Sequence, residues 1–291
     1  MVAPVLIRPC EPVELPALVG LLDEEFIFSK GRSVSLARRF PAVLHARNCP
    51  NILVARRGDA VAAAIVIKRF DWITPERSRR GAMIGMVYTR PAERGKGLAA
   101  QLLRTAEQSL CADGTAFAVL WSAQPDFYRR LGWTSSDCGV FGTFVSPGGN
   151  TAGCCPAEAS AVDALRLRGP DPYTPRSRAS YQTLPPPVEQ LHILASPGGV
   201  AYVIFGVLAD RAYVYEFCGE PSGYAALWQD ICAVAHTIYI NERRGSAAHQ
   251  WLSLQNGVSW RDHALAMWLP LAEHSCARHF SDWYVPFLDR I

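Results

Sequence analysis

Seven consecutive residues lie between a strand-like and a helix-like segment and have the types needed to bind an anion: Arg94, Gly95, Lys96, Gly97, Leu98, Ala99 and Ala100. The preceding run, residues 82–89, is apolar and is followed by Pro91, a residue that cannot continue a central strand. Residues 98–106 then place apolar side chains three and four apart, which is the period of an amphipathic helix. Because a glycine-bearing turn at the start of a helix directs several free backbone N–H groups at one point, we expect a phosphate group to bind there.

Two common phosphate-binding loops do not fit this turn. A P-loop ends in Gly-Lys-Ser or Gly-Lys-Thr, whereas here Gly97 is followed by Leu98. The dinucleotide pattern Gly-x-Gly-x-x-Ala does fit residues 95–100, but it requires an acidic residue about twenty positions later, at the end of the next strand. That strand, expected at residues 115–121, is followed by Ser-Ala-Gln, with no acidic residue at its end.

A second motif follows that strand. Residues 125–133 read Pro-Asp-Phe-Tyr-Arg-Arg-Leu-Gly-Trp, so a short helix bearing Tyr128 stops at a glycine before the next strand. The two motifs together resemble the Gcn5-related N-acetyltransferases (GNAT family), whose acyl-CoA pyrophosphate loop has the pattern Gln/Arg-x-x-Gly-x-Gly/Ala and whose later segment ends in Phe-Tyr-x-x-Leu-Gly-Phe/Trp. The resemblance covers about residues 3–145 and implies a mixed, splayed central sheet flanked by helices.

The resemblance also assigns residues to the co-substrate, acetyl-CoA. It places the pyrophosphate on the amides of residues 95–100, with Arg94 beside it. It places the pantetheine arm and the thioester along five residues: Val87, Tyr88, Thr89, Ala123 and Gln124. Tyr128 matches the family's general acid, since a phenol with a pKa of about 10 is protonated at neutral pH and can donate to a departing thiolate. A core tyrosine beneath the co-substrate is the alternative for this residue, and no metal ion is implied.

The general base is the least determined part of the site. Many members of the family carry a glutamate on the strand that here reads Met-Ile-Gly-Met at residues 83–86, and this chain has none there. Glu24 and Glu25, near the end of the first helix, are one alternative. In tandem-domain members, of the enhanced-intracellular-survival type, the terminal carboxylate enters the active site, which here implies the carboxylate of Ile291 on an apolar tail. A water relay and an already neutral amine stay open as well.

Several apolar residues are expected in loops that flank the acceptor groove of this fold: Phe26, Phe28, Phe70, Trp72 and Ile73. Exposed aromatic side chains in loops tend to bind ligands, so this group indicates an apolar or aromatic amine. Packing against a second domain is an equally good explanation.

The composition is that of a folded protein with enough apolar residues for two ordinary cores, since 49% of the 291 residues are apolar and 19% are charged. A net charge of +3 is too small to indicate a nucleic-acid partner, and no apolar stretch reaches the roughly 20 residues of a membrane span. The N-terminus lacks the pattern of a signal peptide. Nine cysteines without Cys-x-x-Cys spacing indicate neither a zinc site nor a disulfide framework, so we expect reduced thiols and a cytoplasmic location. Assembly into a homo-oligomer stays open.

Two α/β (α+β) domains are expected. Residues 1–147 would form the acetyl-CoA-binding catalytic domain, with a second helix at residues 33–46 and a hairpin at residues 51–68. Residues 148–188, which are rich in Pro and Gly, would form a linker region. Residues 189–291 would form a smaller, degenerate GNAT-like domain.

The second domain is predicted from the order of its elements and not from a motif. Strands at residues 190–195, 199–208 and 211–218 precede a helix at residues 224–235, as in tandem acetyltransferases. No Arg-x-x-Gly-x-Gly loop lies before that helix, so this half should bind no acyl-CoA. An unrelated α+β domain is the alternative.

The function predicted from these features is transfer of an acetyl group from acetyl-CoA to a primary amine of a small molecule or peptide by direct attack. A non-catalytic acyl-CoA-binding or sensor protein is one alternative, favoured by the missing strand glutamate. A longer-chain acyltransferase is another, which the small residues Gly85 and Ala123 near the thioester would permit.

Overall fold

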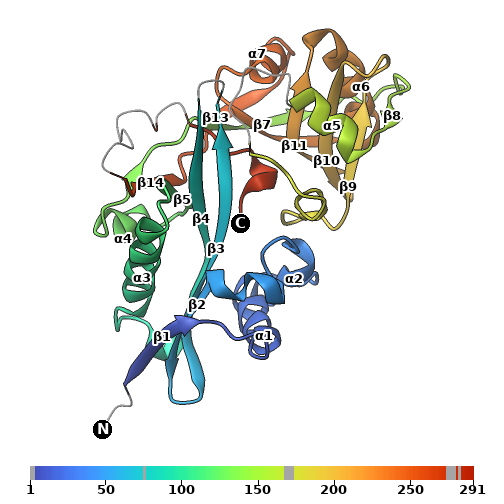
Figure 1. Cartoon of the computed structure of the whole chain (residues 1–291). Helices are drawn as coiled ribbons and strands as arrows, with labels where there is room; N and C mark the ends of the chain where they lie inside the picture. Colours follow the sequence, from blue (N-terminus) through green and yellow to red (C-terminus); the bar gives the residue numbers. More distant parts are fainter. Residues whose placement is uncertain (1–3, 75–76, 167–173, 273–279, 281–282) are drawn as a thin grey trace.

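The computed structural model describes residues 4–74, 77–166, 174–272, 280 and 283–291. Within these residues the chain forms two seven-stranded mixed sheets, each flanked by helices, and the tail of the chain lies where the two sheets meet (Figure 1). The predicted α/β architecture, with a splayed sheet in the first half and a second sheet-based unit, is confirmed.

The first sheet has the strand order β1-β2-β3-β4-β5-β14-β6. Its strands are β1 (Val5–Pro9), β2 (Ile52–Arg57), β3 (Ala60–Ile73), β4 (Ser78–Thr89), β5 (Phe117–Trp121), β14 (Ala266–Pro270) and β6 (Thr134–Ser135). β4 and β5 run parallel, while the other neighbours pair antiparallel. The crossover between β4 and β5 therefore needs a helix, and the segment containing the glycine turn leads into it.

Helices cover both faces of this sheet. α3 (Leu98–Ala112) and α4 (Pro125–Arg129) pack on one face, and α1 (Leu15–Phe26) and α2 (Leu36–Arg39) pack on the other. α3 buries a stripe of residues three and four apart: Leu98, Leu102, Leu103, Ala106 and Leu110. Alternate residues of β3 supply the two cores, since Ile65 faces the α3 side whereas Ala64 and Val66 face the α1 side.

The predicted helix at residues 33–46 is wrong in extent. α2 ends at Arg39, and Phe40 leaves the helical conformation directly before Pro41. The proline ring disfavours α geometry in the residue before it, which explains the early end. The chain then continues through a turn and the 3-10 helix η2 (Ala46–Asn51) into β2.

The second sheet has the order β13-β7-β12-β11-β10-β9-β8. Its strands are β13 (Ser259–Asp262), β7 (Gly139–Val145), β12 (Thr237–Arg243), β11 (Arg211–Gly219), β10 (Ala201–Leu208), β9 (Leu191–Ala195) and β8 (Cys155–Pro156). The helices of this half are α5 (Ala159–Arg166), α6 (Tyr224–Val234) and α7 (Ala247–Ser253), with η7 (Phe287–Asp289) near the end of the chain. α6 and α7 cover one face of the sheet, and α5 and η7 lie on the other.

The two sheets exchange strands across the predicted domain limits. β7 pairs with β12 in the second sheet, although its residues precede position 148. β14, from the last part of the chain, pairs with β5 in the first sheet from Ala266↔Trp121 to Pro270↔Phe117. Each sheet thus includes a strand from the other half of the chain. The domain limits at residues 147 and 189 stay a prediction.

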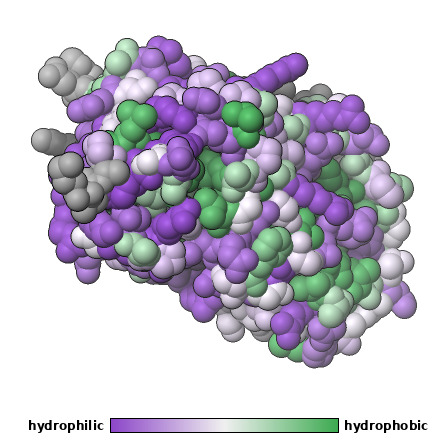
Figure 2. All heavy atoms as spheres, turned by 90° about the horizontal axis from the view of Figure 1, so that it is seen from below, coloured by the Kyte–Doolittle hydropathy of each residue, from purple (hydrophilic) through white to green (hydrophobic). Residues whose placement is uncertain are grey.

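None of the helices in the described part of the chain has the length and apolar character needed to cross a bilayer. On the face seen in Figure 2, apolar side chains lie in separate groups among polar ones.

Candidate active site

The parallel strands β4 and β5 separate at the centre of the first sheet. Their register runs from Gly81↔Phe117 only as far as Met83↔Val119, although β4 continues to Thr89 and β5 to Trp121. β4 bulges at this point, because Met86 has a φ of +51° and the β3–β4 register shifts between Ala64 and Val66. A bulge bends its strand away from a neighbour, and the bend here opens a gap between β4 and β5.

The glycine turn leads from the end of β4 into α3 and is open to a ligand. Gly95 and Gly97 have φ values of +78° and +77°, and a Cβ on either would meet no atom within 4 Å. The amide of Gln101 donates to the carbonyl of Gly97 at 3.1 Å, which is the first bond of the α-helical ladder. The amides of Leu98, Ala99 and Ala100 come before the first helical hydrogen bond, so they remain available to an anion at the helix N-terminus.

The cations of the turn pair with nearby carboxylates. Arg94 donates to the Glu25 carboxylate at 2.8 Å and to the carbonyl of Thr89 at 3.1 Å. Lys96 pairs with Glu93 at 3.2 Å. Arg94 and Lys96 are both about half exposed to solvent, so water weakens these pairs and a diphosphate can compete with the carboxylates for the two cations.

Tyr128 lies on the α3 side of the sheet. It is 8% exposed and belongs to the same core cluster as Leu98, with Phe127 and Trp133 packed edge-on at ring-centroid distances of 4.9 and 6.2 Å. Burial raises the pKa of its phenol, and a hydrogen bond with Ser122 only partly offsets this. The phenol is therefore protonated at neutral pH and can act as a proton donor.

The residues predicted for the pantetheine and the thioester border the gap. Val87 packs against the α3-side core, whereas Tyr88 is 5% exposed and packs on the α1 side. Thr89 ends β4. Ala123 and Gln124 follow β5 and are exposed, and the Gln124 amide donates to the Ser122 hydroxyl at 3.0 Å.

Ile291 reaches the gap from the opposite face. A Cβ built on Gly85 would lie 2.7 Å from the main-chain oxygen of Ile291 and 2.8 Å from its carbonyl carbon. The Ile291 side chain packs against the cores that contain Tyr88 and Met83. Since successive strand residues point to opposite faces, Gly85 and Met83 face the tail while Ile84 faces α3. Tyr128 therefore lies in the core on the α3 side of the sheet, and Ile291 lies on the opposite side, against Gly85.

Two other predictions for the acceptor side receive less support. The Glu25 carboxylate is held by Arg94 at the glycine turn, and Glu24 is exposed. The prediction that Phe70, Trp72 and Ile73 are loop residues is wrong, because all three lie on β3. Phe70 and Trp72 are 8% and 0% exposed. They pack in an aromatic cluster in which Trp72 stacks on Trp283 at 5.6 Å, so the packing explanation holds for this pair.

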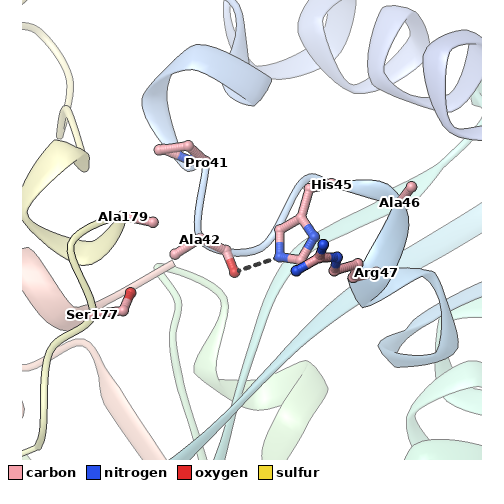
Figure 3. Close-up of a pocket in the computed structure, with 7 residues that line it drawn as sticks. All are labelled: Pro41, Ala42, His45, Ala46, Arg47, Ser177 and Ala179. Atoms are coloured by element: carbon pink, nitrogen blue, oxygen red, sulfur yellow. Dashed lines mark hydrogen bonds between the residues drawn. The ribbon is translucent and has the colours of Figure 1, made fainter.

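A surface hollow of about 480 Å³ lies between residues 41–47 and residues 177–179 (Figure 3). His45 contributes to its wall and forms a hydrogen bond with the Ala42 carbonyl at 3.2 Å, and Arg47 lies beside it. None of the residues predicted to bind acetyl-CoA lines it. The candidate site is therefore the place where β4 and β5 separate, next to the glycine turn. Among the described residues, no group of three or more His, Cys, Asp or Glu side chains could hold a metal ion.

Comparison with known proteins supports the fold described above. Residues 7–135 match the family model described as acetyltransferase (GNAT) domain. A search of curated proteins gives no match. The chain is similar in fold to a GCN5-related N-acetyltransferase from Kribbella flavida, with 17% identity and a TM-score of 0.68 over 91% of this chain and 70% of that one. A GCN5-related N-acetyltransferase from Anabaena variabilis is 15% identical, with a TM-score of 0.73 over 92% of this chain and 73% of that one. Eis1 from Mycobacterium abscessus is 13% identical, with a TM-score of 0.65 over 92% of this chain and 74% of that one. These similarities extend over both sheets.

Proposed function

Residues 7–135 belong to the GNAT acetyltransferase family, and on this premise we propose that the chain is an N-acetyltransferase that moves an acetyl group from acetyl-CoA to a primary amine. The observation that carries the proposal is the β4–β5 gap, with an anion-binding turn at its end, Tyr128 on one face and Ile291 on the other. The fold supports acyl transfer from an acyl-CoA to an amine. The choice of acetyl as the acyl group and the roles of individual residues are part of the proposal.

Acetyl-CoA binds along the α3 side of the sheet. Its pyrophosphate accepts hydrogen bonds from the amides at the start of α3, and Arg94 and Lys96 add positive charge once they leave Glu25 and Glu93. The pantetheine arm fills the gap beside the unpaired part of β4. Unpaired backbone N–H groups of β4 then polarise the thioester carbonyl in place of a β5 partner.

The amine enters from the face that carries Ile291. Its nitrogen attacks the thioester carbonyl carbon, and its proton passes to a base while the C–S bond breaks. The thiolate that leaves takes the proton of Tyr128, which the buried phenol holds at neutral pH. The carboxylate of Ile291, the last residue of the printed sequence, is the base we propose, because its main-chain atoms lie nearest to the bare backbone of Gly85.

A panel of acyl donors and amines tests this function. Acetyl-CoA and longer acyl-CoAs are incubated with aminoglycosides, polyamines, amino acids and peptide N-termini, and release of free CoA thiol is followed with and without each amine. We expect release that depends on both acetyl-CoA and an amine, and that is slower with longer chains. Tight acetyl-CoA binding without amine-dependent release from any member of the panel would instead make the chain a binding or sensor protein.

A further inference from the structure

A cluster of buried charges joins the tail of the chain to both sheets. Its members are Lys68 on β3, Arg166 on α5, Arg176, Glu216 on β11 and Asp289 on η7. The side chains of Arg176 and Asp289 are each 1% exposed, and those of Arg166 and Glu216 are 6% and 10% exposed. None of these residues belongs to the acetyl-CoA site described above.

Asp289 is the member held most completely. Arg176 donates to both of its carboxylate oxygens, at 2.7 and 2.9 Å, and Arg166 lies 3.5 Å from one of them. Arg176 also donates to Glu216, which keeps its guanidinium fixed to the second sheet. On the other side, Lys68 of the first sheet donates to the main-chain carbonyl of Asp289 at 2.6 Å.

The anchored residue lies two positions before Ile291. Two residues span at most about 7 Å, so fixing Asp289 confines the place that the Ile291 carboxylate can reach. Arg290 adds to this restraint, because it donates to the Val285 carbonyl at 3.0 Å and stacks over the Trp121 ring at 4.7 Å. The end of the chain is thus held on both sides of the β4–β5 gap.

Stability alone is a poor explanation for this cluster. Burying five charged groups carries a desolvation cost that well-packed apolar residues would avoid. The Nη1 atom of Arg176 is also buried with no hydrogen-bond partner among the described residues, which is a further cost. Burial by itself would raise the pKa of Asp289, yet the charge and hydrogen bonds of Arg176 bring it below its ordinary value, so the carboxylate stays ionised and the ion pair persists.

We propose that Asp289 is a positioning residue, which Arg176 and Lys68 hold so that the Ile291 carboxylate lies against Gly85 and can accept the proton of the amine. The second half of the chain, which lacks a glycine turn of its own, contributes to the reaction through Arg176, Arg166 and Glu216. This inference rests on the proposed function, since it needs Ile291 to act as the base.

A cycle of two changes tests the inference. Asp289→Asn is made in the chain ending at Ile291 and in a chain extended by Gly-Ser after Ile291, and kcat is measured with acetyl-CoA and the panel amine that the unchanged chain acetylates fastest. A misplacement of about 1 Å can cost up to 10²-fold in rate, so we expect Asp289→Asn to lower kcat by about 10²-fold in the unextended chain. In the extended chain, where the carboxylate is already displaced, it should have no further effect.

Two controls separate positioning from folding. Glu14→Gln removes the ion pairs of Glu14 with Arg8 and Arg56, which lie beside β1 and outside the cluster around Asp289. This variant should keep kcat within twofold of that of the unchanged chain. Lys68→Met, of similar length, removes the hydrogen bond to the Asp289 carbonyl while leaving the Asp289 carboxylate paired. This variant replaces Asp289→Asn in the test if Asp289→Asn does not fold. It should lower kcat about 10-fold with an unchanged Kd for acetyl-CoA. In both tail variants, hydrogen exchange of the peptide covering residues 283–291 should become faster.

The outcomes distinguish the inference from the function on which it rests. If the extension lowers kcat but Asp289→Asn, or Lys68→Met in its place, does not, the positioning role is wrong and the base assignment stands. If Asp289→Asn lowers kcat equally in both chains, its effect does not pass through Ile291, and the inference is again wrong. If the extension alone leaves kcat unchanged, the base assignment fails and the inference fails with it.

Discussion

Substitution of Gly85 by alanine would displace the tail from the β4–β5 gap without touching the acetyl-CoA turn. The added Cβ would lie 2.7 Å from the Ile291 oxygen and 2.8 Å from its carbonyl carbon, whereas an ordinary contact is about 3.4 Å or longer. The Ile291 main chain must therefore retreat by about 0.7 Å. A displacement approaching 1 Å at a reacting group can cost up to about 10²-fold, so kcat should fall by about 10- to 100-fold.

Steady-state kinetics and calorimetry check this prediction together. The Kd for acetyl-CoA should stay within about twofold, because the turn at Gly95 and Gly97 is unchanged. Gly81→Ala is the matched control on the same strand, since the nearest atoms to its Cβ would be ring atoms of Phe117 and Phe70 at 2.6 and 2.7 Å and not the main chain of Ile291. Overpacking costs roughly 1–3 kcal/mol, so this control should lower the Tm while keeping most of the kcat. Equal kcat values for Gly85→Ala and the unchanged chain would refute the placement of Ile291 at the reaction centre.

Three further variants test the glycine turn, the Tyr128 phenol and the Glu14 ion pair. Gly97→Glu should abolish acetyl-CoA binding, because a carboxylate then occupies the pyrophosphate position. Calorimetry of the unchanged chain should show one acetyl-CoA site per chain. Two sites per chain, or binding by the variant, would contradict this. Tyr128→Phe should lower kcat by about 10²–10⁴-fold at nearly unchanged Kd for acetyl-CoA, since only the proton donor is lost. Full turnover in this variant would mean that Tyr128 has a structural role and is not the general acid. The Arg8 hydrogen bond, with Arg56 nearby, lowers the pKa of Glu14 to about 2 in the folded chain, below its usual value. The stabilisation from Glu14 is therefore present above about pH 4.5 and lost as the pH falls towards 2, so the Tm difference between Glu14→Gln and the unchanged chain should shrink over that interval.

The parts of this fold that the sequence predicts best are those with local signals. The glycine turn, the helix α3 after it and the short helix with Tyr128 each depend on residues close in sequence, and the structure places them on one side of one sheet. The strands of the second half were likewise marked by apolar runs between turns, and β10 and β11 lie within two residues of their expected limits.

The parts that the sequence does not predict depend on contacts between distant residues. β14 lies beside β5 although nearly 150 positions separate them, and no local pattern shows which strand a short apolar run will join. Arg176 and Asp289 are 113 positions apart, and either one alone reads as an exposed charge. Their value to the site follows only from the fold, which brings the tail and both sheets together.

In the proposed mechanism, acetyl transfer uses the two faces of the β4–β5 gap, with Tyr128 as acid and the carboxylate of Ile291 as base. The most direct test of this mechanism is the kcat of a chain extended by Gly-Ser after Ile291, with the same two residues added before Met1 as the control. We expect the extended chain to bind acetyl-CoA normally, to turn over at least about 10²-fold more slowly at neutral pH, and to recover partly as rising pH deprotonates the amine itself. Full activity in the extended chain at neutral pH would contradict this mechanism and would leave Glu24, Glu25 or a water molecule to take the proton.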